Sequence, residues 1–347
     1  MSEKIRINLA LQGGGAHGAF TWGVLDRLLD DEDIEIAAIT GSSAGAMNAA
    51  AFKAGIVAGG REGARENLSW LWRTIGGELG DAKLESWLSL FSPTPDMWSQ
   101  AMEMSLPMAL AGTAAQLVSP YFYGPLYQNP LRSVVDQLDF TGVCHADGPC
   151  LFICATNVRT GKVRVFTGDE VNTDAILASA CLPTLFQAVE IDDPQTGRVD
   201  AFWDGGYTGN PALFPLFDPK LPGDIVIVNI NPLERDELPR SPQEIENRIN
   251  EISFNASLLR ELRAIGLVKD MLDSGELVRG TMKELHVHMI ADDTLMQQLS
   301  AQTKAVTNPA LLHDLKKAGR ASADGFLERH KADLARRGTV DIQKLCT

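Results

Sequence analysis

The chain has 347 residues, of which 45% are hydrophobic and 22% charged, and its formal net charge is −14. This length and composition suit one large globular α/β domain with insertions, or two modest domains. The acidic balance argues against a nucleic-acid partner, because nucleic-acid binding needs a basic surface. We find no signal-peptide pattern and no apolar run of about 18 residues, so we expect a cytoplasmic protein.

The amino-terminal part predicts two successive strand–helix units. Residues 5–11 and 34–40 are short apolar runs typical of buried strands. Residues 17–29 have apolar side chains at helical spacing, and residues 44–54 are rich in alanine, as in a helix packed closely on a sheet. Short connections of this kind predict parallel strands with right-handed crossovers.

The next segment differs in composition. Residues 70–127 are rich in tryptophan and methionine and are interrupted by prolines, and we interpret them as a helical, lid-like insertion over the sheet. Flexible thioethers and large rings also suit an acyl-chain tunnel, a homodimer surface or an ordinary core. The sequence leaves these four interpretations open.

Sheet character returns further along the chain. We expect strands at 150–157, 163–166, 225–231 and 285–291, and a helical carboxyl-terminal extension from about residue 300. A long helix begins near residue 242, and its apolar stripe predicts packing across the sheet: Ile245, Ile249, Ile252, Leu259, Leu262 and Ile265. The simplest organisation is a single domain over residues 1–347.

Two glycine motifs follow the first two strands. Gly13 to Gly18 forms a loop at a helix start, where backbone N–H groups can hold a developing negative charge. Gly41 to Gly45 reads G-x-S-x-G with Ser43 at its centre, the pattern of a tight strand-to-helix turn that exposes a nucleophilic serine. The pair predicts a serine acyl hydrolase.

The first motif also spells G-x-G-x-x-G, the fingerprint of dinucleotide binding. That fold needs an acidic residue about 20 positions on, at the end of the second strand. Here residues 36–40 contain no acid and the strand ends in the serine turn. A dinucleotide-binding oxidoreductase is therefore the less favoured alternative, and we expect no cofactor.

As a nucleophile Ser43 needs a general base, and the sequence contains two kinds of candidate. His286, His288 and His313 lie late in the chain and would complete a triad. Asp204 instead lies on a glycine-flanked bend that can approach another loop closely. Its carboxylate is a weak base at neutral pH, but partial desolvation raises the pKa of a carboxyl group.

The five cysteines do not predict a metal centre. Their number is odd, no C-x-x-C occurs, and we find no acidic cluster with calcium-loop spacing, so we expect reduced thiols and no metal. The cysteines are Cys144, Cys150, Cys154, Cys181 and Cys346.

Together, the glycine loop, the serine turn and the late Asp204-Gly205-Gly206 resemble the patatin-like phospholipases. The resemblance covers residues 5–231 and includes the block from Ala178 to Pro183, which is similar to a family block that lines the site. Patatin-like phospholipases are lipid acyl hydrolases with a Ser-Asp dyad. The resemblance implies that Ser43 is the nucleophile and Asp204 the general base, and that backbone N–H groups of Gly13, Gly14 and Gly15 form the oxyanion hole.

One position departs from the family pattern. Where the family loop often carries arginine or lysine, this chain has His17, which makes the charge beside the loop dependent on pH. His17 either positions the loop through a ring N–H, or acts as an electrostatic helper or second acid/base group. A catalytic triad therefore stays open at this point.

The resemblance implies a three-layer α/β/α fold with a mostly parallel central sheet. It also implies a serine esterase of phospholipase A or lysophospholipase type, acting through an acyl-enzyme on lipid or other acyl esters, at a membrane or lipid-body surface. Two alternatives stay open: a hydrolase of a storage polyester or an acyl thioester, and a non-catalytic scaffold that binds lipid.

Overall fold

The computed structural model describes residues 4–79, 119–240, 242–299, 304 and 307–346. The insertion expected at 70–127 falls largely on residues 80–118, which lie outside the described residues. Its first residues, 70–75, complete the long helix α2 (Ala44–Ile75). Trp72 of that helix is buried and donates from its ring to Asn48 Oδ1 at 2.9 Å, so this end belongs to the main body of the protein.

The described strands form one eight-stranded mixed sheet in the order β5-β6-β3-β2-β1-β7-β8, with β4 paired to β3. The central strands are parallel, whereas β4, β5 and β6 pair antiparallel at one end. The strands are β1 (Ile5–Leu11), β2 (Ile34–Gly41), β3 (Cys150–Asn157), β4 (Val163–Thr167), β5 (Val189–Asp193), β6 (Arg198–Asp204), β7 (Asp224–Val228) and β8 (His286–Ile290).

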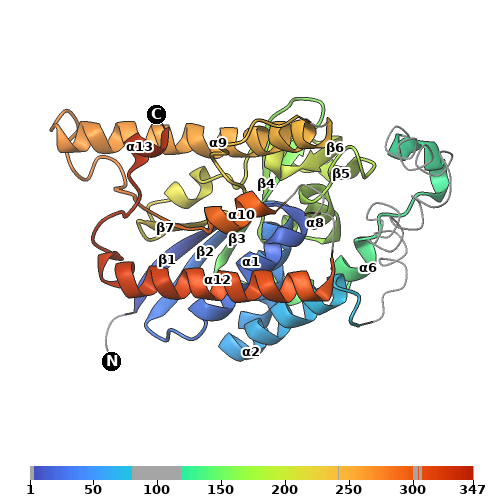
Figure 1. The fold of residues 1–347 in the computed structure, drawn as a ribbon, viewed down its shortest axis with the longest axis horizontal. Coiled ribbons are helices and arrows are strands. Elements are labelled where there is room, and N and C mark those ends of the chain that lie inside the picture. Colours follow the sequence, from blue (N-terminus) through green and yellow to red (C-terminus); the bar gives the residue numbers. More distant parts are fainter. Residues whose placement is uncertain (1–3, 80–118, 241, 300–303, 305–306, 347) are drawn as a thin grey trace.

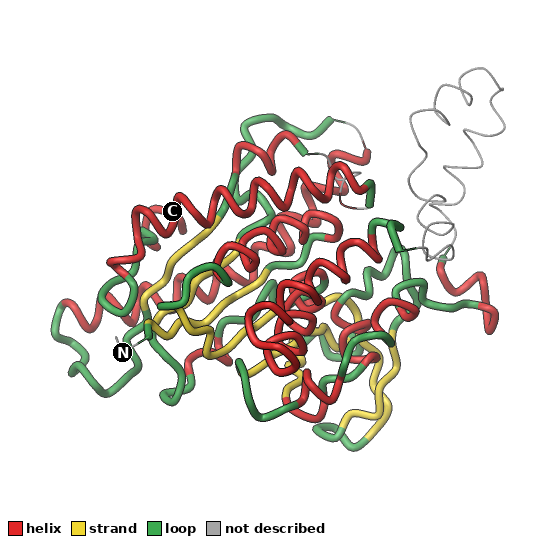
Figure 2. The backbone as a smooth tube through the Cα atoms, turned by 90° about the horizontal axis from the view of Figure 1, so that it is seen from below, coloured by secondary structure: helices red, strands yellow, loops and turns green. Residues whose placement is uncertain are grey.

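Helices cover both faces of this sheet, which gives the three expected layers (Figure 1 and Figure 2). The remaining α-helices are α1 (Gly18–Leu28), α6 (Arg132–Val135), α7 (Phe140–Cys144), α8 (Thr173–Ser179), α9 (Pro242–Asp273), α10 (Asp293–Gln298), α12 (Pro309–His330) and α13 (Ile342–Cys346). The short 3-10 segments are η1 (Gly15–His17), η2 (Pro120–Leu126), η3 (Gly168–Glu170), η4 (Gly205–Tyr207), η5 (Phe214–Phe217) and η6 (Lys331–Asp333).

The alternation of side chains along the strands divides the core into two clusters. In β1, Leu9 and Leu11 face the larger cluster with α1, α2, α8 and α12, whereas Ala10 faces the smaller one. The smaller cluster includes Leu258 and Leu262 of α9. In Figure 1, α9 accordingly lies on the opposite side of the sheet from α12.

The carboxyl-terminal helix α12 packs directly against α1. A Cβ atom on Gly23 of α1 would lie 2.0 Å from the Lys316 carbonyl oxygen, and one on Gly319 would lie 2.0 Å from the Phe20 oxygen. Only glycine allows backbones this close, so these two positions fix the contact of the helices. Across it, the buried carboxylate of Asp26 binds the Arg320 guanidinium.

The predicted packing of α9 is wrong in its first half. Ile249 and Ile252 are 57% and 54% exposed, and Ile245 is also exposed. The inward face at this level is instead built on Glu251 and Phe254, both buried. The apolar spacing predicts the wrong face because one of the buried residues of this half is charged, namely Glu251.

No described helix combines the length and the apolar character that crossing a bilayer requires.

Candidate active site

Ser43 lies between the end of β2 and the start of α2, in a strained backbone conformation. Its φ of 53° is positive, which is unusual for a residue with a side chain. The flanking glycines are required by close approach, since a Cβ on Gly45 would lie 2.2 Å from the Leu11 carbonyl oxygen. This geometry is the tight strand-to-helix turn that the G-x-S-x-G spacing predicts.

The glycine loop lies directly against this turn. A Cβ on Gly13 would be 2.6 Å from the Cβ of Ser43. The Gly13 N–H is already bound, because it donates to Asn210 Oδ1 at 2.7 Å. The N–H groups of Gly14 and Gly15, by contrast, have no hydrogen-bond partner among the described residues. These two amides are therefore available as donors in the described part of the chain.

Asp204 ends β6 beside Ala155 of β3, which brings its carboxyl group to the same edge of the sheet as Ser43. The side chain is fully buried, and its Oδ1 accepts from the Gly206 N–H at 2.7 Å. Oδ2 has no hydrogen-bond partner among the described residues. Burial raises the pKa of Asp204 to about 7, while the Gly206 N–H and the Ser43 side chain act in the opposite direction.

The side chain of Ser43 is thus near enough to Asp204 to lower the pKa of its carboxyl group. A carboxyl group with a pKa of about 7 can both accept and return a proton near neutral pH, which suits a general acid/base. The neighbouring thiol of Cys181 does not compete as a nucleophile, because burial and the charge of Asp204 raise its pKa to about 12.

The block from Ala178 to Pro183 contacts both residues. Ser179 Oγ accepts from the Ser43 N–H at 2.9 Å, and the Asp204 N–H donates to the Cys181 carbonyl at 2.8 Å. Sequence reasoning associated the block with the site through family resemblance but did not identify Ser179 as a contact of Ser43. The hydroxyl of Ser42 donates to the Gly209 carbonyl, a structural bond within the site.

His17 is buried, and its pKa is lowered to about 3 by burial and by the charges of Lys304 and Arg235. The imidazole is therefore neutral from mildly acidic pH upwards. The expectation that the charge beside the loop depends on pH through His17 is wrong, because burial and two nearby cations keep the ring from binding a proton in the usual range.

The late histidines lie away from Ser43. His288 Nε2 binds Asp224 Oδ1 at 2.9 Å, and His286 Nδ1 lies 3.7 Å from Asp224 Oδ2. Asp224 begins β7, which runs parallel to β1 and β2, so this cluster is at the sheet edge opposite the serine turn. His313 of α12 packs edge-on against Trp22, with ring centroids 6.1 Å apart.

A buried network of side-chain amides supports the glycine loop, and sequence reasoning missed it. Gln12 donates to Asn210 O and Asn255 Oδ1, and its Oε1 accepts from the N–H of Asn231 at 3.0 Å. Asn231 in turn donates to the Gly13 carbonyl at 2.7 Å. The sequence signals only part of this network, because Gln12 and Asn231 follow apolar strands, whereas Asn210 comes from a loop and Asn255 from α9.

No group of three histidine, cysteine or acidic side chains suited to a metal ion occurs within the ranges that the structure describes.

The strained serine turn lies at the carboxyl edge of a mostly parallel sheet that helices cover on both faces, an α/β/α fold. The Patatin family model, described as patatin-like phospholipase, matches residues 9–217, more than half of the chain. The chain therefore belongs to the patatin-like phospholipase family, whose members are lipid acyl hydrolases. The match ends before β7, so α9 and α12 lie beyond it.

Among solved structures, VipD from Legionella pneumophila is similar with a TM-score of 0.42 and 14% sequence identity, over 94% of this chain and 67% of that chain. No curated protein sequence matches the chain.

Proposed function

We propose that this chain hydrolyses lipid acyl esters with Ser43 as nucleophile and Asp204 as general base. One observation supports the proposal: Asp204, a buried carboxyl group with a pKa of about 7, lies near enough to the side chain of Ser43 for that side chain to lower its pKa, and Ser43 is held at positive φ. Family membership supports the same reaction class.

In the first step, Asp204 takes the hydroxyl proton of Ser43 while Oγ forms a bond to the ester carbonyl carbon. The carbonyl electron pair moves onto oxygen. Collapse of this intermediate breaks the bond to the leaving alcohol, which receives its proton from Asp204. Water then gives a proton to Asp204 and attacks the acyl-enzyme, and the second collapse releases the fatty acid and returns the proton to Ser43.

The oxyanion formed in each step needs preorganised donors. We assign this role to the backbone N–H groups of Gly14 and Gly15, which have no other partner among the described residues. The Gly13 N–H, bound to Asn210, positions the loop instead. One such donor typically contributes about 3 kcal/mol to lowering the barrier.

For the substrate we propose a phospholipid or lysophospholipid, on the support of the family description. A storage polyester or an acyl thioester would use the same chemistry. We retain the single-domain organisation as part of the proposal, since β7, α9 and α12 pack on the same sheet and helices as the matched residues.

A fluorophosphonate probe and an ester panel test the proposal together. We expect covalent labelling of Ser43, hydrolysis of phospholipid or lysophospholipid, and loss of both in Ser43→Ala. Ser274→Ala, which changes an exposed serine near the end of α9, is the matched control. Lipid binding without labelling or turnover would identify a non-catalytic scaffold. A preference for polyester or thioester would replace phospholipid as the proposed substrate class.

A further inference from the structure

Lys304 contacts the glycine loop although it lies far beyond the residues that the family model matches. A Cβ on Gly15 would lie 2.3 Å from the Lys304 carbonyl oxygen and 3.6 Å from its Cβ. The main chain at Lys304 therefore rests on the backbone of Gly15. Because Gly15 has a φ of 58°, a glycine is needed there for conformation as well as for space.

The side chain of Lys304 reaches the same loop by a second route. Its Nζ donates to Asn231 Oδ1 at 3.0 Å. The amide nitrogen of Asn231 donates to the Gly13 carbonyl at 2.7 Å and to Gln12 Oε1 at 3.2 Å. The ammonium group thus sets the orientation of the amide that holds the first glycine of the loop.

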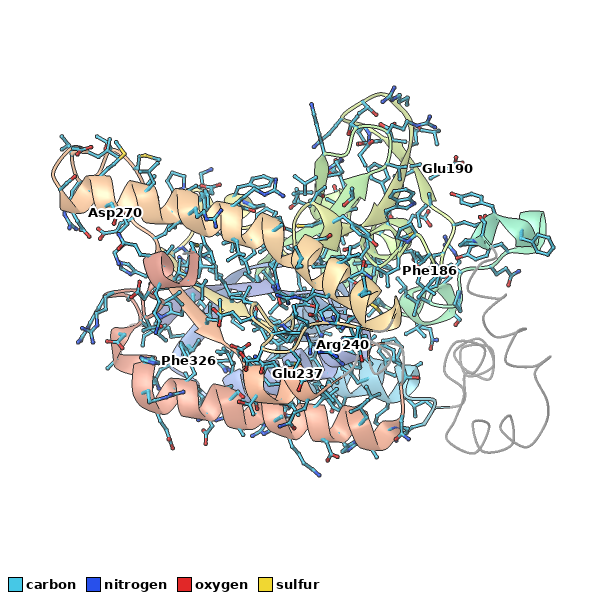
Figure 3. All side chains as sticks on the ribbon, turned by 45° about the horizontal axis from the view of Figure 1, so that its top comes forward. Phe186, Glu190, Glu237, Arg240, Asp270 and Phe326 are labelled. Carbon is cyan, nitrogen blue, oxygen red and sulfur yellow. The ribbon has the colours of Figure 1, made fainter. Side chains whose placement is uncertain are left out.

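Lys304 shares its carboxylate partner Glu251 with two arginines. Among the described residues, three cationic side chains surround the buried carboxylate of Glu251: Arg235 at 2.7 Å, Arg248 at 3.3 Å and Lys304 at 3.8 Å. Arg235 comes from the connection between β7 and α9 that also carries Glu237 and Arg240, labelled in Figure 3. These four side chains together carry net positive charge.

The effect of that charge is seen at His17, whose pKa Lys304 and Arg235 lower in addition to burial. A neutral His17 leaves the loop dependent on cations from elsewhere in the chain. Lys304 is the one of the three that also hydrogen-bonds to the loop's supporting amide, through Asn231.

We propose that Lys304 is a positioning residue for ester hydrolysis: its ammonium group fixes Asn231 and the glycine loop and supplies positive charge beside the developing oxyanion, so turnover requires Lys304 to be protonated. This inference rests on the proposed function. A preorganised loop matters because small displacements of catalytic donors are costly to the rate.

The surroundings of Lys304 place the pKa of its ammonium group in a pH range in which activity can be measured. Burial lowers the pKa of Lys304 to about 8; Glu251 on α9 opposes this shift and Arg235 adds to it. Arg248 faces the same carboxylate from α9, and neutral His17 faces the pair from the glycine loop. Above about pH 8 the ammonium loses its proton, and its ion pair with Glu251 and one of the three positive charges around that carboxylate are lost with it.

The inference therefore predicts a bell-shaped dependence of kcat on pH. The acidic limb reflects ionisation of Asp204 and lies near pH 7, and the alkaline limb reflects Lys304 and lies near pH 8. A residue that only anchored the chain would affect stability without creating the alkaline limb.

The test compares the pH profiles of Lys304→Met, Lys304→Arg and the wild type on the best ester of the panel. We expect Lys304→Met to lower kcat roughly 10- to 100-fold at pH 7.5, with KM little changed, and to lose the alkaline limb. Lys304→Arg should retain most activity and move the alkaline limb above about pH 9, since arginine stays protonated. Lys317→Met, which changes an exposed lysine of α12, is the matched control.

An alkaline limb that stays near pH 8 in Lys304→Arg overturns the inference, even if Lys304→Met fails to fold. Full kcat of a folded Lys304→Met at pH 7.5 overturns it as well. Labelling of Ser43 separates this failure from failure of the proposed function. A wild-type protein that neither becomes labelled nor hydrolyses ester refutes the function. An active wild type whose Lys304 variants have the wild-type pH profile refutes only the role of Lys304.

Discussion

The backbone N–H of Ser43 donates to the hydroxyl oxygen of Ser179 at 2.9 Å, and that hydroxyl donates onward to the Cys154 carbonyl at 2.6 Å. The bond connects the serine turn to β3 and to the end of α8. A residue with a side chain held in a sparsely populated positive-φ conformation costs about 1–3 kcal/mol. Ser179 therefore helps to hold Ser43 in a conformation that the local chain disfavours.

Ser179→Ala should lower both stability and turnover. It leaves the buried N–H of Ser43 without its acceptor, which typically costs about 1–3 kcal/mol. We expect a lower midpoint in denaturant unfolding and a reduced kcat with little change in KM, because substrate contacts stay in place. Ser274→Ala is the surface control. A destabilised variant with the wild-type kcat would mean that the bond serves folding alone.

Asp204 predicts a defined pH dependence of activity. With a pKa of about 7, the base is mostly protonated at pH 6 and mostly ionised at pH 8. The value of kcat/KM should therefore rise with pH through about 7. Rates measured between pH 5 and 7.5, below the alkaline limb, test this, and a limb near pH 4 would show that another group titrates.

The same shift predicts a gain of stability when the carboxylate is removed. The native state retains its proton up to about pH 7, whereas the unfolded chain ionises near 4, so stability contributed by protonated Asp204 is present at low pH and is lost as pH rises. Asp204→Asn should be inactive, and at pH 8 more stable than the wild type by a few kcal/mol, on the order of the linkage energy.

Asp200→Asn is a strict comparison because Asp200 lies on the same strand and is also buried, but pairs with Arg198 at 3.1 Å. It should retain turnover and lose stability, the reverse of Asp204→Asn. If both variants kept full activity, neither carboxylate would be the base.

The serine turn and the glycine loop were predictable because each depends on a local pattern. A strand followed by Gly41 to Gly45 has few ways to fold, and the observed positive φ of Ser43 agrees with that pattern. The strand at 5–11 was likewise evident from its apolar run, and the structure confirms it as β1.

The supports of the site were not predictable because their partners are distant in sequence. Asn231 and Lys304 meet the glycine loop across more than 200 residues, and no local spacing indicates that contact. Burial of Glu251 also inverted the apparent apolar face of α9. Burial of a charge depends on its partner, here Arg235, which only the folded chain brings to it.

His17 should behave as a neutral residue in the working pH range. His17→Gln keeps a neutral polar side chain, so we expect the positions of both limbs of the pH profile to stay unchanged. His17→Lys would instead place a further cation beside Lys304 and Arg235, which already lower the pKa at this position. We expect it to be destabilised by at least about 1 kcal/mol, since like charges repel strongly when partly buried.

Thermal unfolding and pH–rate profiles of the two variants check this expectation. A shift of either limb in His17→Gln would show that the imidazole titrates during turnover. Wild-type stability of His17→Lys would show that the added cation is not repelled there.

The histidine cluster at the opposite edge of the sheet should serve stability and not catalysis. Burial alone would raise the pKa of Asp224, but hydrogen bonds with His288 and the Ala335 N–H, together with the nearby His286 ring, hold it well below its usual range. His288 also meets Thr339 Oγ1 at 3.1 Å, which ties the carboxyl-terminal segment to β8. Removing one member leaves a buried group without its partner, which costs roughly 3–5 kcal/mol in comparable pairs.

We therefore expect His288→Ala to unfold at much lower denaturant concentration while the folded fraction keeps a near wild-type kcat. Active-site titration with the fluorophosphonate probe corrects the rate for the amount of folded protein. His313→Ala, which loses a ring contact with Trp22, is the histidine control. A fall of kcat by several orders of magnitude per titrated site would reinstate a triad, because only a group acting on Ser43 can change the rate without changing the number of folded sites.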